Sequence, residues 1–208
     1  MFKAWLRVFA IFGSLAAAPA MAEQVQGVGF GDSLMAGYQL APGQAFPTML
    51  EAALKEKGHD IVIANAGVSG DTTSGGLSRL TWSVPDGTDF VILELGANDA
   101  LRGVSPELTR ANLDEMITRL KDRGIDVILT GMLAPPNMGE DFAARFDPIF
   151  PELAEQHGLD FYPFFLDGVA AQDALLLGDG MHPNGDGVAE MVERFMPVME
   201  AYLAKRAP

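Results

Sequence analysis

Cysteine is absent from the 208-residue sequence, and histidine occurs only three times. Without cysteine we expect neither a disulfide nor a lipid attached to an N-terminal cysteine. The histidines His59, His157 and His182 are scattered along the chain. Asp179 and His182 together would supply only two ligands, which is too few for a structural metal site. The sequence therefore predicts no disulfide framework and no resident metal ion.

Positive charge is also scarce, since 14 lysine and arginine residues stand against 28 aspartate and glutamate residues, for a formal net charge of −14. Nucleic-acid affinity depends mainly on neutralising phosphates, and strongly anionic membrane surfaces repel an acidic protein. No basic stripe interrupts this acidity. We therefore expect no nucleic-acid partner, and the acidity itself indicates solubility rather than a particular partner.

Long hydrophobic runs are lacking too, and the longest candidate lies at the N-terminus. Two basic residues precede the apolar run Val8–Ala18, and Ala20-Met21-Ala22 has the small-residue pattern of a cleavage site. The run is far shorter than the roughly 20 residues that a membrane-spanning helix requires. The pattern predicts a signal peptide over residues 1–22 and a periplasmic or secreted mature protein over residues 23–208, without an integral membrane anchor.

No repeat, low-complexity segment or composition change divides residues 23–208, which are therefore predicted to form one domain. Five short apolar runs alternate with helical patterns, as in α/β proteins whose parallel strands are covered on both faces. The runs are Val25–Phe30, Ile61–Ala66, Phe90–Leu95, Val127–Met132 and Leu159–Tyr162. Helices are predicted over Ala45–Lys57, Pro106–Arg123, Phe142–His157 and Gly185–Ala204. The predicted fold is a doubly wound, three-layer α/β/α sandwich.

Ser33, Gly70 and Asn98 each follow one of the first three predicted strands. In a doubly wound sheet, ligands bind outside the carboxyl ends of the strands, so these three residues are expected to meet in one crevice. Ser33 lies in Gly31-Asp32-Ser33-Leu34, between a strand and a helix. Backbone N–H groups and the helix dipole favour a negative oxygen at such a turn. Ser33 is therefore a candidate nucleophile.

A serine hydroxyl becomes a good nucleophile only when a neighbouring base removes its proton. The loop Asp179-Gly180-Met181-His182 offers such a base together with a carboxylate. Its spacing lets Asp179 hold the imidazole Nδ1–H while Nε2 faces Ser33. His59 in a polar turn and His157 at a helix end have structural explanations instead. We therefore interpret Ser33, His182 and Asp179 as a candidate catalytic triad.

Simpler interpretations exist for single residues of this set. Ser33 alone would be a helix N-cap, Gly70 a turn glycine with positive φ, and Asn98 a turn residue that bonds its own backbone. Asp32 and Asp99 would suit a glycosidase carboxylate pair, but the histidine would then have no task. Asp32 is therefore interpreted as a support for the turn, and Asp99 as a capping or supporting carboxylate.

The glycines of Gly27-Val28-Gly29-Phe30-Gly31-Asp32 are similar to a dinucleotide-binding fingerprint. However, the sixth position is aspartate rather than glycine, and the glycines begin inside a predicted strand rather than after it. No nucleotide cofactor is therefore expected.

The segments GDS at 31–33, Gly70, GxND at 96–99 and DxxH at 179–182 resemble, in order, the four motif blocks of the SGNH or GDSL hydrolases. The resemblance runs from about Val25 to about Phe195 and is closest to the bacterial periplasmic thioesterase I, arylesterase and lysophospholipase type. It implies a flavodoxin-like strand order 2-1-3-4-5. It also implies an oxyanion hole formed by the backbone N–H groups of Ser33 and Gly70 and the side-chain amide of Asn98.

The resemblance further implies a cofactor-free serine hydrolase of small-molecule esters, acyl thioesters and lysophospholipids that works through an acyl-enzyme. In the thioesterases it resembles, the loop after the fourth strand helps to form an acyl pocket, so Leu133, Pro135 and Met138 are expected to contact substrate. Two alternatives stay open, a carbohydrate O-acetyl esterase and an inactive periplasmic binding protein on the same scaffold. The apolar loop favours acyl chains over sugar acetates, whereas the motifs specify neither the natural substrate nor the oligomeric state.

Overall fold

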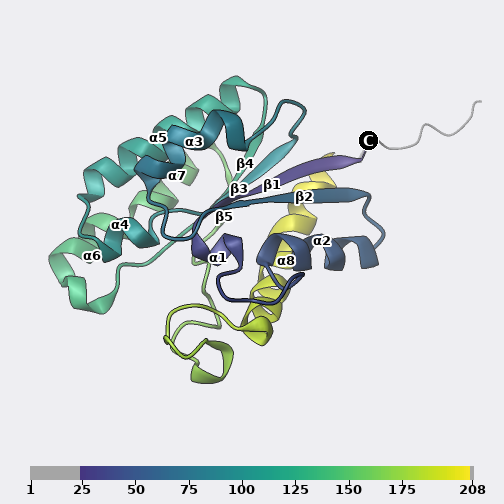
Figure 1. Cartoon of the computed structure of the whole chain (residues 1–208). Helices are drawn as coiled ribbons and strands as arrows, with labels where there is room; N and C mark the ends of the chain where they lie inside the picture. The colour runs from purple at the N-terminus through teal and green to yellow at the C-terminus, as the bar shows by residue number, and fades with distance from the viewer. Residues whose placement is uncertain (1–23, 207–208) are drawn as a thin grey trace, which may run out of the picture.

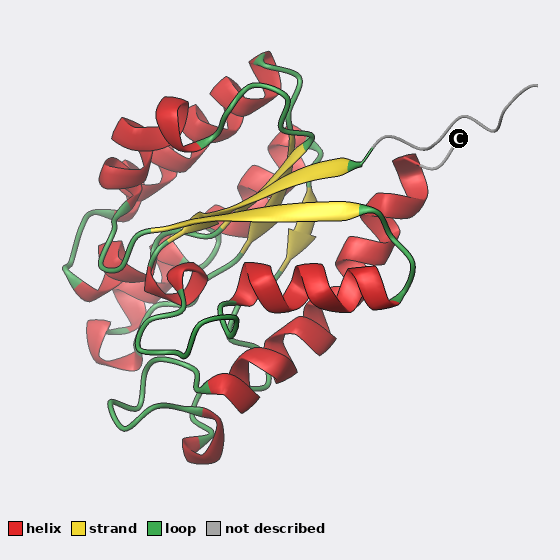
Figure 2. Ribbon diagram, turned by 45° about the vertical axis from the view of Figure 1, so that its right-hand side comes forward, coloured by secondary structure: helices red, strands yellow, loops and turns green. Residues whose placement is uncertain are grey.

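The computed structural model describes residues 24–206, which form a parallel five-stranded sheet with helices on both faces (Figure 1, Figure 2). The strands are β1 (Val25–Gly31), β2 (Ile61–Gly67), β3 (Phe90–Leu93), β4 (Asp126–Thr130) and β5 (Asp160–Tyr162). They lie in the order β2-β1-β3-β4-β5, and all neighbouring pairs are parallel. The predicted fold class and strand order are confirmed.

Helices cover the sheet in two layers, with α2 and α8 on one face and α3, α5 and α7 on the other (Figure 1). The helices are α1 (Ser33–Ala36), α2 (Phe46–Glu56), α3 (Thr73–Ser83), α4 (Ala97–Leu101), α5 (Pro106–Asp122), α6 (Glu140–Phe146), α7 (Ile149–His157) and α8 (Gly185–Arg206). The predicted helices α2, α5 and α8 are confirmed to within a few residues. The helices α3 and α4 were not predicted, because glycine and polar residues interrupt their apolar pattern.

The prediction of one helix over Phe142–His157 is wrong, because the structure divides this segment into α6 and α7. Pro148 separates them, since proline has no N–H to donate and its ring obstructs the preceding turn. The carboxylate of Asp147 instead accepts a hydrogen bond from the backbone N–H of Ala134 at 2.8 Å. Buried apolar side chains before and after Pro148, among them Phe146 and Phe150, have the spacing of one continuous helix, which explains the wrong prediction.

The glycines inside β1 are explained by close packing rather than by nucleotide binding. A Cβ at Gly27 would lie 2.2 Å from the Phe90 ring, and one at Gly29 would lie 2.7 Å from Pro47 and from the Met35 sulfur. Such distances are far shorter than ordinary contacts between carbon atoms. These glycines therefore let neighbouring side chains pack directly against the strand.

The predicted signal peptide, residues 1–22, lies outside the described residues. Over residues 24–206, no helix combines the length and the hydropathy that crossing a bilayer would require. The longest helix, α8, spans 22 residues and buries one face that includes Met191, Phe195 and Met199. It is thus an amphipathic helix of the core.

Candidate active site

Ser33 is the first residue of α1, and only Asp32 separates it from the end of β1. The preceding Asp32 caps the helix, because its Oδ1 accepts a hydrogen bond from the Leu34 N–H at 3.0 Å. Gly31 must be glycine, since a Cβ there would lie 2.4 Å from the Glu94 carboxyl group and 2.6 Å from its backbone oxygen. The strand, the tight turn and the cap together hold the Ser33 hydroxyl at the carboxyl edge of the sheet.

His182 lies between Ser33 and Asp179 in space. Its Nε2 is 2.9 Å from the Ser33 Oγ, and its Nδ1 is 2.7 Å from Oδ2 of Asp179. The structure therefore brings together the residues interpreted as a triad, with each ring nitrogen facing the expected partner. This geometry allows the imidazole to take a proton from the hydroxyl while the carboxylate holds the other N–H.

The Asp179 carboxylate is held in its charged form. Its Oδ1 accepts hydrogen bonds from the backbone N–H groups of His182 and Met181, at 3.0 and 2.9 Å. These bonds, first that from the His182 backbone, lower the pKa of Asp179 to about 2. Asp179 is therefore ionised at any pH near neutral, as a carboxylate that stabilises an imidazolium must be.

Tyr38 covers the imidazole ring, with ring centroids 4.4 Å apart and planes tilted by 38°. Its contact with His182 joins the segment after α1 to a loop near the C-terminus. This contact was not predicted, because a tyrosine five positions after Ser33 belongs to no recognisable motif. The tilted tyrosine ring limits the rotation of the imidazole and so helps to keep Nε2 directed at Ser33.

Gly70 and Asn98 line the same cavity as Ser33. Gly70 follows β2 in the left-handed conformation, with φ of 79°. Asn98 belongs to α4, and its Nδ2 donates a hydrogen bond to Oδ2 of Asp32 at 2.8 Å. An amide nitrogen has two hydrogens, so this bond orients the group and leaves the second N–H for a ligand. The structure thus brings Gly70 and Asn98 to the cavity that Ser33 lines.

Asp32 and Glu94 form a buried acidic pair beneath the serine turn, and neither side chain reaches solvent. Burial raises the pKa of Asp32 to about 6, against hydrogen bonds from Leu34 and Asn98 that lower it. Burial, followed by the charge of Asp32, raises the pKa of Glu94 well above its usual range. Glu94 Oε2 accepts a hydrogen bond from the Asp32 backbone N–H at 3.1 Å. Burial therefore favours the uncharged form of Glu94, and its hydrogen bond to the Asp32 backbone supports the turn that carries Ser33.

The role of Glu94 was not predicted, because its only signal was an acid inside the apolar run predicted as the third strand. The strand ends at Leu93, one residue before this acid. Asp99, in contrast, supports the fold as predicted, because it accepts hydrogen bonds from the backbone N–H of Thr73 at 2.8 Å and from the hydroxyl of Thr109 at 3.3 Å. Asp99 does not line the cavity, so Asp32 and Asp99 do not form the carboxylate pair of a glycosidase.

A cavity of about 620 Å³ opens beside Ser33, and its walls are mainly apolar. The apolar side chains that line it include Leu101, Met132, Leu133, Pro135, Phe164 and Leu166. Of the expected substrate contacts, Leu133 and Pro135 thus lie in the wall, whereas Met138 does not. Met138 ends a short 3₁₀ turn (η1, Pro136–Met138), and its methyl group lies near Gly103 instead. The wall from residues 164–176 was not predicted.

Histidine at other positions takes no part in this site. The Nε2 of His157 lies 2.5 Å from a carboxylate oxygen of Asp114, on the surface between α5 and α7. Within the part of the chain that the structure describes, no group of three or more histidine, aspartate or glutamate side chains has the arrangement of a metal site. The groups assembled around Ser33 are its hydroxyl, the imidazole of His182, the carboxylate of Asp179 and the side-chain amide of Asn98.

Known proteins similar to this chain fall in one family. The model of the GDSL-like lipase/acylhydrolase family matches residues 30–189. An arylesterase of Vibrio mimicus is 39% identical over 186 residues, which cover 88% of this chain and 92% of that protein. Thioesterase 1/protease 1/lysophospholipase L1 of Escherichia coli K12 is 34% identical over 157 residues, covering 75% of this chain and 74% of that protein.

Solved structures agree with these sequence matches. The structure of AlinE4, an SGNH-hydrolase family esterase, superimposes with a TM-score of 0.73 at 43% identity, covering 91% of this chain and 100% of that one. A crystal structure of TesA superimposes with a TM-score of 0.80 at 32% identity, covering 85% of this chain and 98% of that one.

Proposed function

The chain belongs to the GDSL-like lipase/acylhydrolase family, and we propose that Ser33, His182 and Asp179 are the catalytic triad of this SGNH-type esterase and thioesterase. One observation carries the proposal: contacts of 2.7 and 2.9 Å run from the Asp179 carboxylate through the imidazole to the Ser33 Oγ. As a hydrolase acting on ester bonds, the protein requires an activated nucleophile. We propose that the contacts from Asp179 through His182 activate the Ser33 hydroxyl for this role.

In the acylation step, the Ser33 Oγ attacks the acyl carbonyl carbon while its proton passes to Nε2 of His182. The Asp179 carboxylate stabilises the imidazolium that results. The imidazolium then gives this proton to the departing alcohol or thiol, and the acyl group stays on Ser33. In the second step, His182 removes a proton from water, which attacks the acyl carbon and displaces Ser33 Oγ. The proton returns to Ser33, and a carboxylic acid leaves.

The negative oxygen of each tetrahedral intermediate is proposed to lie among three donors. They are the backbone N–H groups of Ser33 and Gly70 and the side-chain amide of Asn98. The Ser33 N–H is available because the first N–H groups of a helix have no partner within it. Asp32 holds the Asn98 amide in place at 2.8 Å, so the donor needs no reorganisation when charge develops.

Replacing Asn98 with alanine is expected to lower kcat roughly 10²–10³-fold with little change in KM, because the donor acts mainly on the transition state. Steady-state kinetics on p-nitrophenyl octanoate would measure both constants. The matched control is Asn137→Ala, which removes an exposed amide that does not line the cavity. A loss confined to KM would make Asn98 a substrate-binding residue instead.

The substrates are proposed to be esters and thioesters with an extended acyl chain, with Leu133 and Pro135 against that chain. The apolar wall of the cavity supports this assignment, since it offers few partners to the hydroxyl groups of a sugar. A comparison of p-nitrophenyl acetate, butyrate and octanoate tests it, and we expect hydrolysis to extend to octanoate. Cleavage of acetate alone would favour a carbohydrate O-acetyl esterase, and cleavage of none would favour a binding protein.

Export is proposed as well, with residues 23–208 as the single mature hydrolase domain. Lys3 and Arg7 before the apolar run and the small residues up to Ala22 support cleavage by a signal peptidase. N-terminal sequencing of the protein from its native host is expected to begin at Glu23. An intact Met1, or recovery of the protein in the cytosolic fraction, would contradict export.

A further inference from the structure

Arg102 differs from the other arginines of residues 24–206 in its partner. Each of the others forms an ion pair with a carboxylate, at Arg79, Arg110, Arg119, Arg123, Arg145, Arg194 and Arg206. Within the same residues, Arg102 has no carboxylate within salt-bridge distance, and its Nη2 donates to the backbone oxygen of Gly70 at 2.6 Å. A protein with twice as many acidic as basic residues thus leaves this guanidinium uncompensated.

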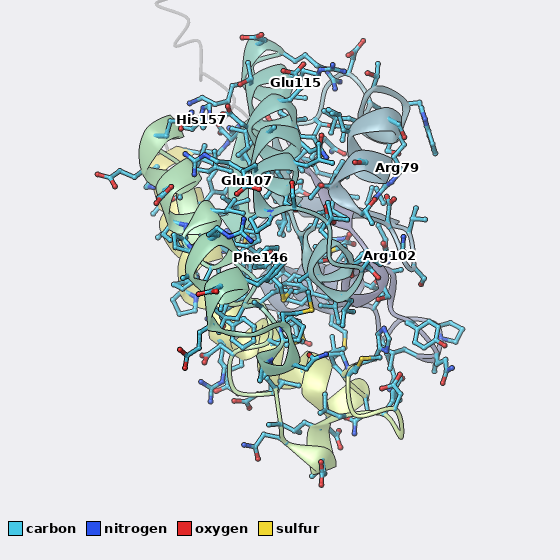
Figure 3. The ribbon with its side chains drawn as sticks, turned by 90° about the vertical axis from the view of Figure 1, so that its left-hand side faces the viewer. Arg79, Arg102, Glu107, Glu115, Phe146 and His157 are labelled. Carbon is cyan, nitrogen blue, oxygen red and sulfur yellow. The ribbon has the colours of Figure 1, made fainter. Side chains whose placement is uncertain are left out.

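This guanidinium lies at the rim of the catalytic cavity. Arg102 follows directly after α4, which carries Asn98, and its neighbour Leu101 lines the cavity, as does Gly70. Figure 3, which faces the end of the molecule with α4 and α6, labels Arg102 on this side. Asp71, next to Gly70, is paired with Arg79 at 2.6 Å and does not cancel the charge. The rim beside the proposed oxyanion donors therefore carries a guanidinium that no carboxylate of residues 24–206 pairs with.

The chemistry of the side chain points to a phosphate. A guanidinium carries five N–H donors in a planar fork that suits the oxygens of phosphate, and the bond to Gly70 uses only one of them. That bond also fixes the side chain, so less rotamer entropy is lost when an anion binds. An exposed arginine at a rim can meet a phosphate that stays partly hydrated, without the cost of burying the charge.

The position of Arg102 at the rim places it on the side of the substrate that carries the leaving group. The acyl chain is assigned to the apolar wall, so the alcohol or thiol must extend toward solvent from the carbonyl carbon. Resting on the proposed function, we infer that Arg102 is an anion-binding subsite for a phosphate group carried by the leaving group. Two kinds of acyl donor share this chemistry, lysophospholipids with a phosphodiester and coenzyme A thioesters with nucleotide phosphates.

The test compares substrates that differ in phosphate. Octanoyl-coenzyme A is paired with octanoyl-pantetheine, and 1-octanoyl-glycerophosphocholine with monooctanoylglycerol. For each pair, the ratio of kcat/KM with phosphate to kcat/KM without it is measured in wild type and in Arg102→Met. We expect the ratio to fall roughly 5- to 20-fold in the variant at low salt, as for loss of a partly screened, charge-assisted hydrogen bond. If the substitution also displaces Gly70, kcat/KM falls equally for both substrates of a pair, and the ratio does not change.

Three further variants sharpen the comparison. Lys121→Met removes the same charge from a lysine that donates to the backbone oxygen of His157 rather than to a carboxylate. In Figure 3, His157 lies well away from Arg102, and we expect this variant to keep the wild-type ratio. In Arg102→Lys the ratio should fall less than in Arg102→Met, because lysine retains the charge but not the planar set of N–H donors. Arg102→Gln, which retains a donor for Gly70, repeats the test if Arg102→Met does not fold.

The outcomes separate the possibilities. A fall in the ratio for the thioester pair alone supports a nucleotide phosphate as ligand, and a fall for the glycerol pair alone supports a lipid phosphate. Unchanged ratios, or an equal loss on both members of each pair, would overturn the subsite and leave Arg102 as a support for Gly70. Calorimetric binding of free coenzyme A and of glycerophosphocholine requires no turnover. If neither ligand binds the wild type more tightly than Arg102→Met, the subsite fails even where the hydrolase assignment stands.

Discussion

Replacing Ser33 with alanine is expected to lower kcat by roughly 10⁴–10⁶-fold, which is the scale of losing the nucleophile of a triad. The Ser33 Oγ contacts Nε2 of His182 at 2.9 Å and is the atom proposed to form the acyl-enzyme. The helix cap is supplied by Asp32 rather than by Ser33, so the fold should survive the change. Hydrolysis of p-nitrophenyl octanoate measures the loss, and thermal unfolding by circular dichroism checks the fold.

Ser78→Ala is the matched control for this variant, because Ser78 is an exposed serine whose hydroxyl donates to the Gly75 oxygen within α3. It should keep wild-type activity. A folded Ser33→Ala protein with more than a few per cent of wild-type kcat would remove Ser33 as the nucleophile. Labelling the wild type with a fluorophosphonate provides an independent test, in which mass spectrometry should find one adduct, on Ser33.

Replacing Asp179 with asparagine is expected to lower kcat by about 10³–10⁴-fold, close to the effect of the same change in the serine protease triad. The variant loses the negative charge that stabilises the imidazolium. Its amide also presents a donor to Nδ1, which now lies 2.7 Å from a carboxylate oxygen, and so favours the wrong tautomer. Steady-state kinetics on one activated ester, between pH 5 and pH 9, measures the effect.

The pKa of Asp179, lowered to about 2, determines how the contribution of this carboxylate to the stability of the fold depends on pH. A carboxyl group whose pKa is lower in the folded than in the unfolded state stabilises the fold above its ordinary pKa of about 4. That stabilisation is lost as the pH falls from about 4 to about 2, and it stays constant above this window. Protonation of Asp179 therefore does not limit the wild type between pH 5 and pH 9, and the asparagine defect should persist throughout.

Asp173→Asn is the control, since it changes an exposed aspartate of the segment that precedes the same loop. We expect wild-type kinetics from it. If Asp179→Asn kept the wild-type plateau and pH profile, Asp179 would leave the triad, and Asp173 or Asp186 would be tested in its place.

Local sequence was enough to predict the sheet and the meeting of three site residues. Apolar runs of four to six residues mark parallel strands, because both faces of such strands are buried. The ends of those runs then placed Ser33, Gly70 and Asn98 at one edge of the sheet, where the structure has them around one cavity. The spacing of Asp179 and His182 predicted their mutual orientation, because residues three apart in a short loop contact each other directly.

Other features were not predictable from local pattern. The division of one predicted helix at Pro148 depends on how loops pack after the chain has folded. The absence of Met138 from the cavity wall has the same cause. The contacts of Glu94 with the serine turn, of Tyr38 with the imidazole, and of Arg102 with the Gly70 oxygen join segments distant in sequence. No periodicity marks such contacts, since each depends on the position of a second segment.

The sequence by itself thus determined the layered α/β architecture and the candidate catalytic residues. Through the family resemblance it also determined the strand order. The tertiary structure alone decided the 2.9 Å contact between Ser33 and His182, which are 149 positions apart. It also decided the shape of the apolar cavity and the pKa of Asp32, because burial depends on every segment that covers a group. Strand formation depends on near neighbours in the chain, whereas desolvation and contact distance depend on neighbours in space.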